Sequence, residues 1–485
     1  MGNTQYNAPR PRRDTAANTP NGRNAAQTDF NADPNSVPNR AAASAGRKKT
    51  SATTAKSPRR KTPGQGTPVF EEPDIALRKK KPTVSPSPAT ADSRERDKAR
   101  RKRKRRIVNV MRVRGGVDRP LLVVIVLLLC FGSIMVFSAS NAYALHKYGD
   151  SYYYIKRQIL FAAIGLAVMF GVSFMDYRIF QHFTVPVFLV VVVLLIITPI
   201  YGLAAGVARR WIIIAGVRFQ PSELMKLALV MMLAWYYDRF EAKVNDRSNF
   251  MLSSQYSMFI PFGIVMGVCL LIMLENHFSC MIIMFLIGMS VMFVGGARKL
   301  WFGIGGASVG VLLVFAISLS SYARERVDVF LHPEKYSAQD EVWQTLQGLY
   351  AIGSGGLLGV GLGNSRQKHM FVSEPQNDFI FSIICEELGM VGALAVIALF
   401  ILFVWRGLVV SMRAPNTYSK LVAFGITAKV AIQAVLNMGV VTGVLPNTGI
   451  SLPFFSYGGT SLVVLLIEMG VLLAISRYSY EQNVT

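Results

Sequence analysis

Ten apolar stretches, each close to 20 residues long, follow one another along the chain after residue 118. An α-helix needs about 20 mostly apolar residues to cross a bilayer. The stretches cover residues 119–140, 157–175, 183–202, 222–238, 257–274, 278–296, 300–320, 379–405, 420–444 and 457–476. The sequence therefore predicts an all-α, polytopic membrane protein with about ten transmembrane helices.

Basic residues fall in every second connection between these stretches. The connections predicted to face the cytoplasm carry Arg178, then Arg239, Lys243 and Arg247, then Arg298 and Lys299, and finally Arg406, Arg413 and Lys420. This alternation follows the excess of Lys and Arg in cytoplasmic loops. An even number of spans returns the C-terminus to the starting side, so we expect both termini in the cytoplasm.

The residues before the first stretch have a different composition. Residues 1–118 hold 28 Lys and Arg against 10 Asp and Glu, and they contain 12 of the 22 prolines. Such a segment buries too little apolar surface to offset its ordering entropy. We predict a disordered basic cytoplasmic tail over residues 1–116 and a membrane domain over residues 117–480. The basic run at residues 100–106 predicts a topology anchor that contacts anionic lipid. Because membrane spans follow this run directly, we do not expect it to bind nucleic acid.

A long polar loop, residues 321–378, separates the predicted seventh and eighth spans. Loops of this length are usually functional. Several cations lie on the predicted outer side against the topological preference: Arg209, Arg210, Arg218, Arg324, Arg326, Lys335, Arg366 and Lys368. They predict an anionic ligand such as a pyrophosphate, whose oxygens arginine matches bidentately. The alternative is that they pair with acids of the same loop.

Ionisable residues inside apolar stretches are costly and are therefore functional candidates. They are Glu223, Lys226, Glu386, Glu387, Lys429 and Glu468. Glu223 and Lys226 stand three residues apart on one helix face, close enough to pair, so an internal ion pair and phosphate binding by Lys226 both stay open. Glu386 and Glu387 are expected to hold neighbouring helices.

Asp378 stands at the mouth of the eighth predicted span, beside the loop cations. A general base must be ionised and within hydrogen-bond reach of a hydroxyl, and we expect nearby Arg or Lys to keep this carboxylate ionised. The alternative for Asp378 is an N-cap of the helix that follows. The four cysteines lie in apolar stretches without metal-site spacing, so they indicate packing residues.

Several blocks of residues occur in the order of one known family over about residues 117–478. They are Arg209-Arg210-Trp211, Gln220-Pro221-Ser222-Glu223 with Lys226, Gly353-Ser354-Gly355-Gly356, Asn377-Asp378-Phe379-Ile380-Phe381 with Glu386-Glu387, and Pro446-Asn447-Thr448-Gly449 followed by Leu452-Pro453-Phe454-Phe455-Ser456-Tyr457-Gly458-Gly459. They resemble the SEDS family (shape, elongation, division and sporulation), which contains the RodA and FtsW proteins. The stretch Gly361 to Lys368 resembles the division and sporulation branch.

The resemblance implies a peptidoglycan glycosyltransferase that polymerises lipid II at the outer face of the cytoplasmic membrane and releases undecaprenyl pyrophosphate. It implies a class B penicillin-binding protein as transpeptidase partner, other division proteins nearby, and Asp378 as the essential carboxylate. Together with the charges above, it predicts a substrate-binding set of Arg209, Arg210, Glu223, Lys226, Arg324, Arg326, Gln344, Lys368, Glu374, Asn447 and Ser456. No cofactor is assigned, and a divalent cation, Mg²⁺ or Mn²⁺, is left open.

Two segments depart from the pattern of the family. Where the family usually has Gln-Pro-Asp-x-Gly-Thr, this chain has Glu275-Asn276-His277-Phe278-Ser279-Cys280. Where it usually has Leu-Pro-Glu-x-x-Thr-Asp, this chain reads Val372-Ser373-Glu374-Pro375-Gln376-Asn377-Asp378. Two alternative functions stay open: translocation of lipid II across the bilayer, and a catalytically weak scaffold that recruits the penicillin-binding protein.

Overall fold

The computed structural model describes most of the chain after residue 114. The described residues are 115–205, 210–214, 216–246, 248–275, 277–305, 307, 328, 330–332, 335, 340–447 and 449–478. The predicted basic tail, most of the seventh predicted span (300–320) and much of the first half of the long loop lie outside these residues, so those predictions stay untested.

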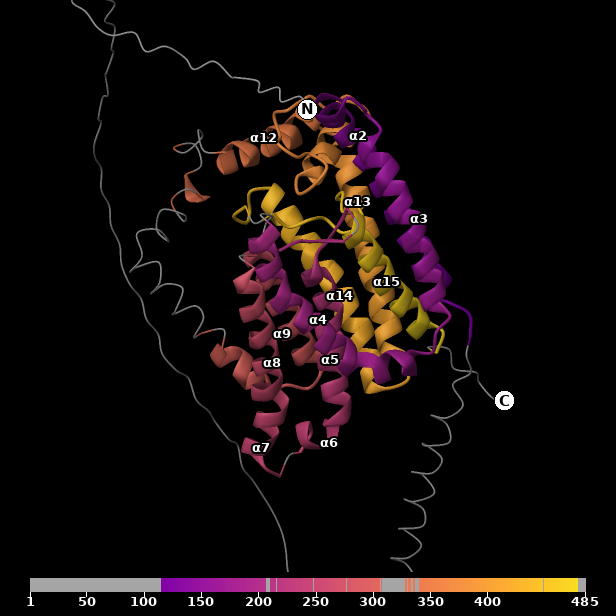
Figure 1. Cartoon of the computed structure of the whole chain (residues 1–485), viewed down its shortest axis with the longest axis vertical. Helices are drawn as coiled ribbons and strands as arrows, with labels where there is room; N and C mark the ends of the chain where they lie inside the picture. Colours follow the sequence, from indigo (N-terminus) through magenta and orange to yellow (C-terminus); the bar gives the residue numbers. More distant parts are fainter. Residues whose placement is uncertain are drawn as a thin grey trace, which may run out of the picture. The chain divides into compact units, whose positions relative to one another are not determined.

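Helices account for nearly all of the regular structure in the described residues (Figure 1). They are α2 (Arg119–Tyr148), α3 (Tyr153–Ser173), α4 (Tyr177–Ala205), α5 (Pro221–Arg239), α6 (Glu241–Val244), α7 (Phe250–Ser254), the π-helical turn η1 (Gln255–Phe259), α8 (Ile260–Leu274), α9 (Phe278–Val294), α12 (Asp340–Gly355), α13 (Ile380–Met412), α14 (Thr417–Val441) and α15 (Gly459–Ser476). The predicted all-α membrane fold is confirmed.

The helices agree with nine of the ten predicted spans. Within the described residues, seven helical stretches are long and apolar enough to cross a membrane. The helix α9 is shorter, at 17 residues, and α5 carries charged side chains, although both coincide with predicted spans. The total of ten spans therefore stays a prediction.

Among the seven candidate spans, α15 and α14 are the most deeply buried by the other helices. The helix α15 packs on α3, α14 packs on both α13 and α5, and α5 also packs on α4. Apolar side chains on the outer helices stay exposed, for example Leu160 of α3 and Leu189 of α4, as expected of surfaces that face lipid. Figure 1 shows α12 lying across one end of the helices, with α6 and α7 at the opposite end.

The helix α13 is broken at Gly389, where φ is 66° and ψ is −162°. The break frees backbone groups, and the loop after α12 pairs with them: Met390 N donates to Gly356 O at 3.0 Å, and Gly361 N donates to Glu387 O at 3.0 Å. The approach is close enough that a Cβ at Gly355 would lie 1.9 Å from Cys385 O. The glycine-rich stretch therefore serves backbone-to-backbone docking, which keeps irregular backbone satisfied inside a membrane protein.

The described segment is joined at its two ends. Gly115 N donates to Arg477 O at 2.8 Å, and Arg477 Nε donates back to Gly115 O at 3.3 Å. Asp118 caps α2 through Leu121 N and forms an ion pair with Arg406 of α13. These bonds tie the start of α2 to the end of α15 and to the far end of α13.

Candidate active site around Asp378

Asp378 lies in the irregular segment that leads into α13, and it is partly buried. Phe379, and not Asp378, occupies the cap position of the helix, and no side chain caps it. The Asp378 carboxylate faces the segment before α15, because a Cβ at Gly449 would lie 3.3 Å from Asp378 Oδ2. Asp378 is therefore not the N-cap of α13, and its carboxylate faces the loop that contains Gly449.

Three hydrogen-bonded contacts hold the backbone around Asp378. Asn437 Nδ2, near the end of α14, donates to Asp378 O at 2.7 Å and to Ile450 O at 2.6 Å. Ser456 Oγ donates to Asn377 O at 2.8 Å, and Tyr457 N donates to Gln376 O at 2.8 Å. The segment 376–378 is therefore fixed against both α14 and the segment that precedes α15.

Burial and two charged neighbours act on the pKa of Asp378. The pKa of Asp378 is raised to about 6, mainly by burial and also by the negative charge of Glu374, while Arg210 acts in the opposite direction. Burial outweighs the influence of Arg210 on the pKa. The expectation that nearby Arg or Lys keeps the carboxylate ionised stays a prediction, because Arg209, Arg324 and Arg326 lie outside the described residues. A pKa near 6 still leaves the carboxylate mostly ionised at neutral pH, and it places a general base close to its working pH.

A short antiparallel hairpin carries the Arg210 region. Strands β1 (Ile212–Ile214) and β2 (Val217–Phe219) pair directly after Arg210, and Thr460 Oγ1 at the start of α15 donates to Arg218 O at 2.9 Å. Arg210 is exposed and influences the pKa values of Asp378, Glu275 and His277. The structure thus brings one predicted outer cation near the predicted catalytic carboxylate.

Four of the ionisable residues of the spans pair with one another. Lys226 Nζ lies 2.6 Å from Glu223 Oε1, and its side chain is 2% exposed. Lys429 Nζ lies 2.7 Å from Glu468 Oε2 between α14 and α15. The ion-pair alternative for Glu223 and Lys226 is confirmed, which leaves phosphate binding by Lys226 without support from this geometry.

Lys368 has a different position from the one expected of a substrate-binding loop cation. Its side chain is 1% exposed, and Nζ contacts Glu387 Oε1 at 3.1 Å and donates to Gly363 O at 2.6 Å. Glu386 accepts hydrogen bonds from Ser365 Oγ and from Arg366 N. Glu386 and Glu387 thus hold the loop on α13, and Lys368 neutralises Glu387 inside the protein.

The remaining predicted residues have varied positions. Glu374 is exposed and accepts a 2.6 Å hydrogen bond from Asn377 Nδ2, while Asn447 Oδ1 accepts from Gly449 N at 3.4 Å. Gln344 lies partly buried on α12. Arg209, Arg324 and Arg326 lie outside the described residues. Within the described residues no three His, Cys, Asp or Glu side chains gather as metal ligands, so the divalent cation stays a prediction.

Asn437 is the functional candidate that the sequence analysis missed. Its amide joins the backbone of Asp378 to that of Ile450, yet it lies within a predicted span and carries no charge. A polar side chain inside an apolar stretch was the available signal.

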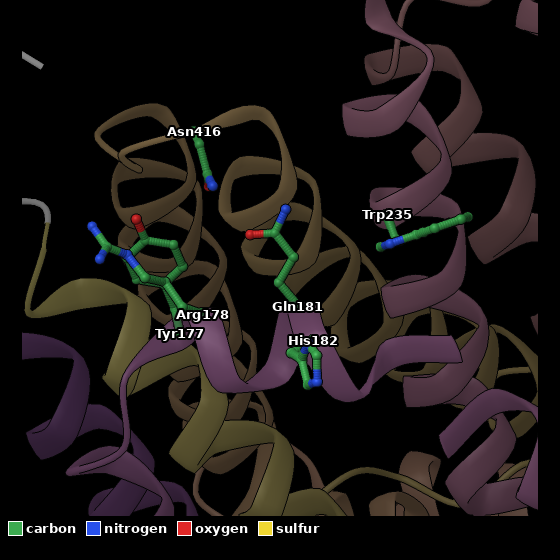
Figure 2. Close-up of a pocket in the computed structure, with 6 residues that line it drawn as sticks. All are labelled: Tyr177, Arg178, Gln181, His182, Trp235 and Asn416. Carbon is green, nitrogen blue, oxygen red and sulfur yellow. The ribbon is translucent and has the colours of Figure 1, made fainter. Parts of the chain in front are cut away.

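A separate pocket of about 460 Å³ lies at the other end of α14. Figure 2 shows its lining side chains, which come from the start of α4, from α5 and from the residue that caps α14: Tyr177, Arg178, Gln181, His182, Trp235 and Asn416. Asn416 and Asn437 are separated by about 30 Å along α14 at 1.5 Å per residue. This pocket is therefore distinct from the surroundings of Asp378.

Comparison with known proteins gives consistent matches over the membrane domain. A family model described as cell cycle protein, covering FtsW, RodA and SpoVE, matches residues 119–481. Stage V sporulation protein E of Bacillus subtilis is 39% identical over 368 residues, which cover 75% of this chain and 97% of that protein. A probable peptidoglycan glycosyltransferase FtsW of Geobacter sulfurreducens is 38% identical over 362 residues, covering 74% and 95%.

Two solved structures have a similar fold. One comes from work on the structural coordination of polymerization and crosslinking by a peptidoglycan synthase complex, with a TM-score of 0.62 and 24% identity, covering 76% of this chain and 99% of that one. The other is the rod shape determining protein RodA of Thermus thermophilus, with a TM-score of 0.55 and 23% identity, covering 76% and 98%.

Proposed function

This chain belongs to the family of FtsW, RodA and SpoVE cell cycle proteins, and we propose on that premise that it is a peptidoglycan glycosyltransferase that polymerises lipid II. A relative at 38% identity, matched over 95% of its length, is named a probable peptidoglycan glycosyltransferase. The protein crosses the cytoplasmic membrane several times, with both termini in the cytoplasm and Asp378 at the outer face. The relatives named FtsW and stage V sporulation protein E favour a role in division or spore wall synthesis.

The observation that carries the mechanism is the setting of Asp378. Its carboxylate is partly desolvated, with a pKa of about 6, its backbone is fixed by Asn437, and Arg210 acts on it electrostatically. Within the described residues no hydrogen bond occupies its carboxylate oxygens. A general base needs this combination of a matched pKa, a fixed position and a free acceptor.

The proposed step begins when Asp378 accepts the proton of an acceptor sugar hydroxyl. The hydroxyl oxygen forms the new bond to the anomeric carbon of the donor sugar, and the bond from that carbon to the pyrophosphate breaks. Undecaprenyl pyrophosphate leaves with the electron pair, and Asp378 then loses its proton to water. A pyrophosphate leaves without a protonating acid, and a cation such as Arg210 stabilises its charge.

The partner in this proposal is a class B penicillin-binding protein that crosslinks the strands. The proposal is supported by the similar fold within a complex described as coordinating polymerization and crosslinking. Anionic lipid and division proteins are the proposed contacts of the basic tail, and dependence on Mg²⁺ or Mn²⁺ is tested by adding a chelator to the assay described next.

Polymerisation of lipid II by the purified full chain tests the proposal, with wild type and Asp378→Asn assayed with and without a class B partner. Glycan strands from wild type alone are expected. Strands from both proteins would remove Asp378 from the reaction while keeping the transferase. If folded wild type makes no strands even with its partner, translocation or scaffolding would replace the proposal, and accessibility of labelled lipid II would separate those two.

A further inference from the structure

The pocket at the start of α14 lies between helices of the membrane domain, far from Asp378. Its volume of about 460 Å³ is within the range of small-molecule sites. Its lining comes from α4, from α5 and from Asn416, the residue that caps α14. Arg178 belongs to a connection predicted to face the cytoplasm. On the proposed topology, the pocket therefore opens at the cytoplasmic surface of the membrane.

Hydrogen-bond donors are prominent in the lining of the pocket. Arg178 has an exposed guanidinium and Trp235 carries an indole N–H, and none of the described lining residues carries a carboxylate. Two carboxylates stand beside the lining, and both are engaged. Asp238 accepts from Gln181 Nε2 at 2.9 Å and from a backbone N–H of α14 at 3.2 Å, and Asp176 Oδ1 accepts from Arg178 N at 3.0 Å. The pocket therefore favours an anionic ligand.

The two amide side chains of the pocket have orientations fixed by their partners. Gln181 turns Nε2 toward the Asp238 carboxylate, because only the amide nitrogen can donate to it, and Oε1 remains as an acceptor. Asn416 turns Oδ1 toward Ser419 N at 2.9 Å, and Nδ2 remains as a donor. Figure 2 shows the two amides extending toward one another from α4 and from the start of α14. Within the described residues no hydrogen bond occupies either remaining atom, so the pocket offers one amide donor and one amide acceptor.

Apolar surface continues from the pocket along α4. Ile179 and Phe183 are 40% and 52% exposed, and their spacing of four residues places them on one face of the helix. The ring of Phe183 contacts that of His182, a lining residue, with 5.3 Å between ring centres. Tyr177 and Trp235 in the lining are of the aromatic types enriched at membrane interfaces. This continuity favours a ligand with an acyl chain over a soluble phosphate.

We propose that this pocket binds the phosphate of an anionic glycerophospholipid from the cytoplasmic leaflet. The guanidinium of Arg178 matches phosphate oxygens bidentately, Asn416 Nδ2 donates to the same group, and Gln181 Oε1 accepts from a headgroup hydroxyl. Basic pockets between transmembrane helices on the cytoplasmic side bind headgroups of this class. The site lies far from Asp378 and takes no part in the transfer step, so it holds or fails independently of the proposed polymerase.

Binding of phosphatidylglycerol to the full-length protein in detergent provides the first test, with bound lipid counted by native mass spectrometry. Wild type should bind phosphatidylglycerol about tenfold more tightly than phosphatidylcholine. Arg178→Gln should lose about tenfold in that affinity, because a hydrogen bond between charged groups is lost. The control is Lys299→Gln, which removes an exposed cation of another connection on the same side. The basic tail is present in every variant, so differences between variants report on the pocket. Equal losses in both variants would assign the binding to general surface charge and overturn the proposal.

His182 provides a second, matched pair of variants, because its side chain is exposed and lines the pocket. His182→Glu places a negative charge beside the bound phosphate and should weaken phosphatidylglycerol binding about tenfold. His182→Gln, which adds no charge, should stay within about twofold of wild type. Melting temperatures confirm that the variants are folded. Wild-type affinity in His182→Glu would overturn the proposal even if Arg178→Gln failed to fold.

Competition with soluble phosphates distinguishes a lipid from a free phosphate as the ligand. Inorganic phosphate and glycerol 3-phosphate, each in about hundredfold excess, should leave phosphatidylglycerol bound, because neither covers the apolar face of α4. Displacement by either one at a concentration equal to that of the lipid would identify a site for a soluble phosphate and overturn the proposal. Binding that depends on Arg178 would support the proposal even if the protein formed no glycan strands.

Discussion

Among single side chains, Asp378 has the most consequences for activity. Replacing it with asparagine removes the proton acceptor, and a lost general base typically costs 10²–10⁴-fold in rate. Because the base works only when ionised, the wild-type rate should fall as the pH drops through about 6. Initial rates of lipid II polymerisation at a series of pH values measure this fall, the acid limb of the pH–rate profile. An unchanged rate at pH 5 would contradict the role of Asp378.

Glu374 offers a sharper form of the same experiment, because its negative charge raises the pKa of Asp378. Glu374→Gln removes that charge, so the acid limb of the pH–rate profile should move to lower pH. Glu241→Gln, on the exposed helix α6, should leave the limb in place. A limb that moves upward in Glu374→Gln would show that another group governs it.

Asn437 should act as a positioning residue for Asp378. Its amide donates to Asp378 O and to Ile450 O, so Asn437→Ala is expected to lower kcat about tenfold or more with little change in KM. The acid limb should keep its midpoint, because the carboxylate itself is intact. Asn364→Ala, which removes a single exposed amide contact to Val360 O, is the control. A change confined to KM would argue for substrate contact instead.

Sequence reasoning located Asp378 from its place between an outer loop and an apolar stretch. It misjudged Lys368, because the direction of a loop side chain depends on how the loop folds onto α13. It could not give the extent to which burial raises the pKa of Asp378, because desolvation arises from packing that no local pattern records.

Among the helices and loops, the break in α13 and the glycine-rich loop form one unit. Gly389→Ala should destabilise the protein by about 1–3 kcal/mol, because its backbone conformation is one that essentially only glycine adopts, and by more because a Cβ there would lie 2.4 Å from Gly359 N. Gly353→Ala is the control, since a Cβ there meets nothing within 4 Å. Thermal unfolding in detergent compares the two variants. Equal melting temperatures would argue against tight docking.

The buried pair of Lys368 and Glu387 should show strong coupling. Glu387→Gln leaves the ammonium of Lys368 buried without its counter-charge, which typically costs about 3–5 kcal/mol. The double variant Lys368→Met with Glu387→Gln should recover part of that loss. Thermal unfolding of the two single variants and the double variant measures the coupling. Additive losses would mean that the two side chains act independently.

The apolar pattern was sufficient to predict the nine helices that coincide with predicted spans, because a bilayer imposes length and composition on any spanning helix. The hairpin β1–β2 was not predicted, since three-residue strands leave almost no pattern. The helix α12 was read as loop, because it is too polar to register as a span.

Taking the chain as a whole, the first 106 residues should be dispensable for polymerisation. Stage V sporulation protein E is matched over 97% of its own length by 75% of this chain, and Gly115 and Asp118 are the first described residues with structural contacts. Deletion of residues 1–106 is therefore expected to keep the polymerisation rate within about twofold.

Deletion through Asp118 should behave differently, because it removes the N-cap of α2 and the ion pair with Arg406. Losing one partner of a largely buried pair destabilises by about 3 kcal/mol. Rates and melting temperatures of the two truncations measure the difference. Equal stability of both would show that the ends contribute little.

The bonds between Gly115 and Arg477 also hold the start of α2 beside the end of α15. Because residue 115 is bonded to residue 477, a short linker from residue 478 to residue 115 could take the place of residues 479–485 and 1–114, and new termini could open in the turn after α6. Close chain ends are what make circular permutation tolerable. A permuted chain that folds would show that the order in which the ribosome synthesises these helices does not determine how they pack.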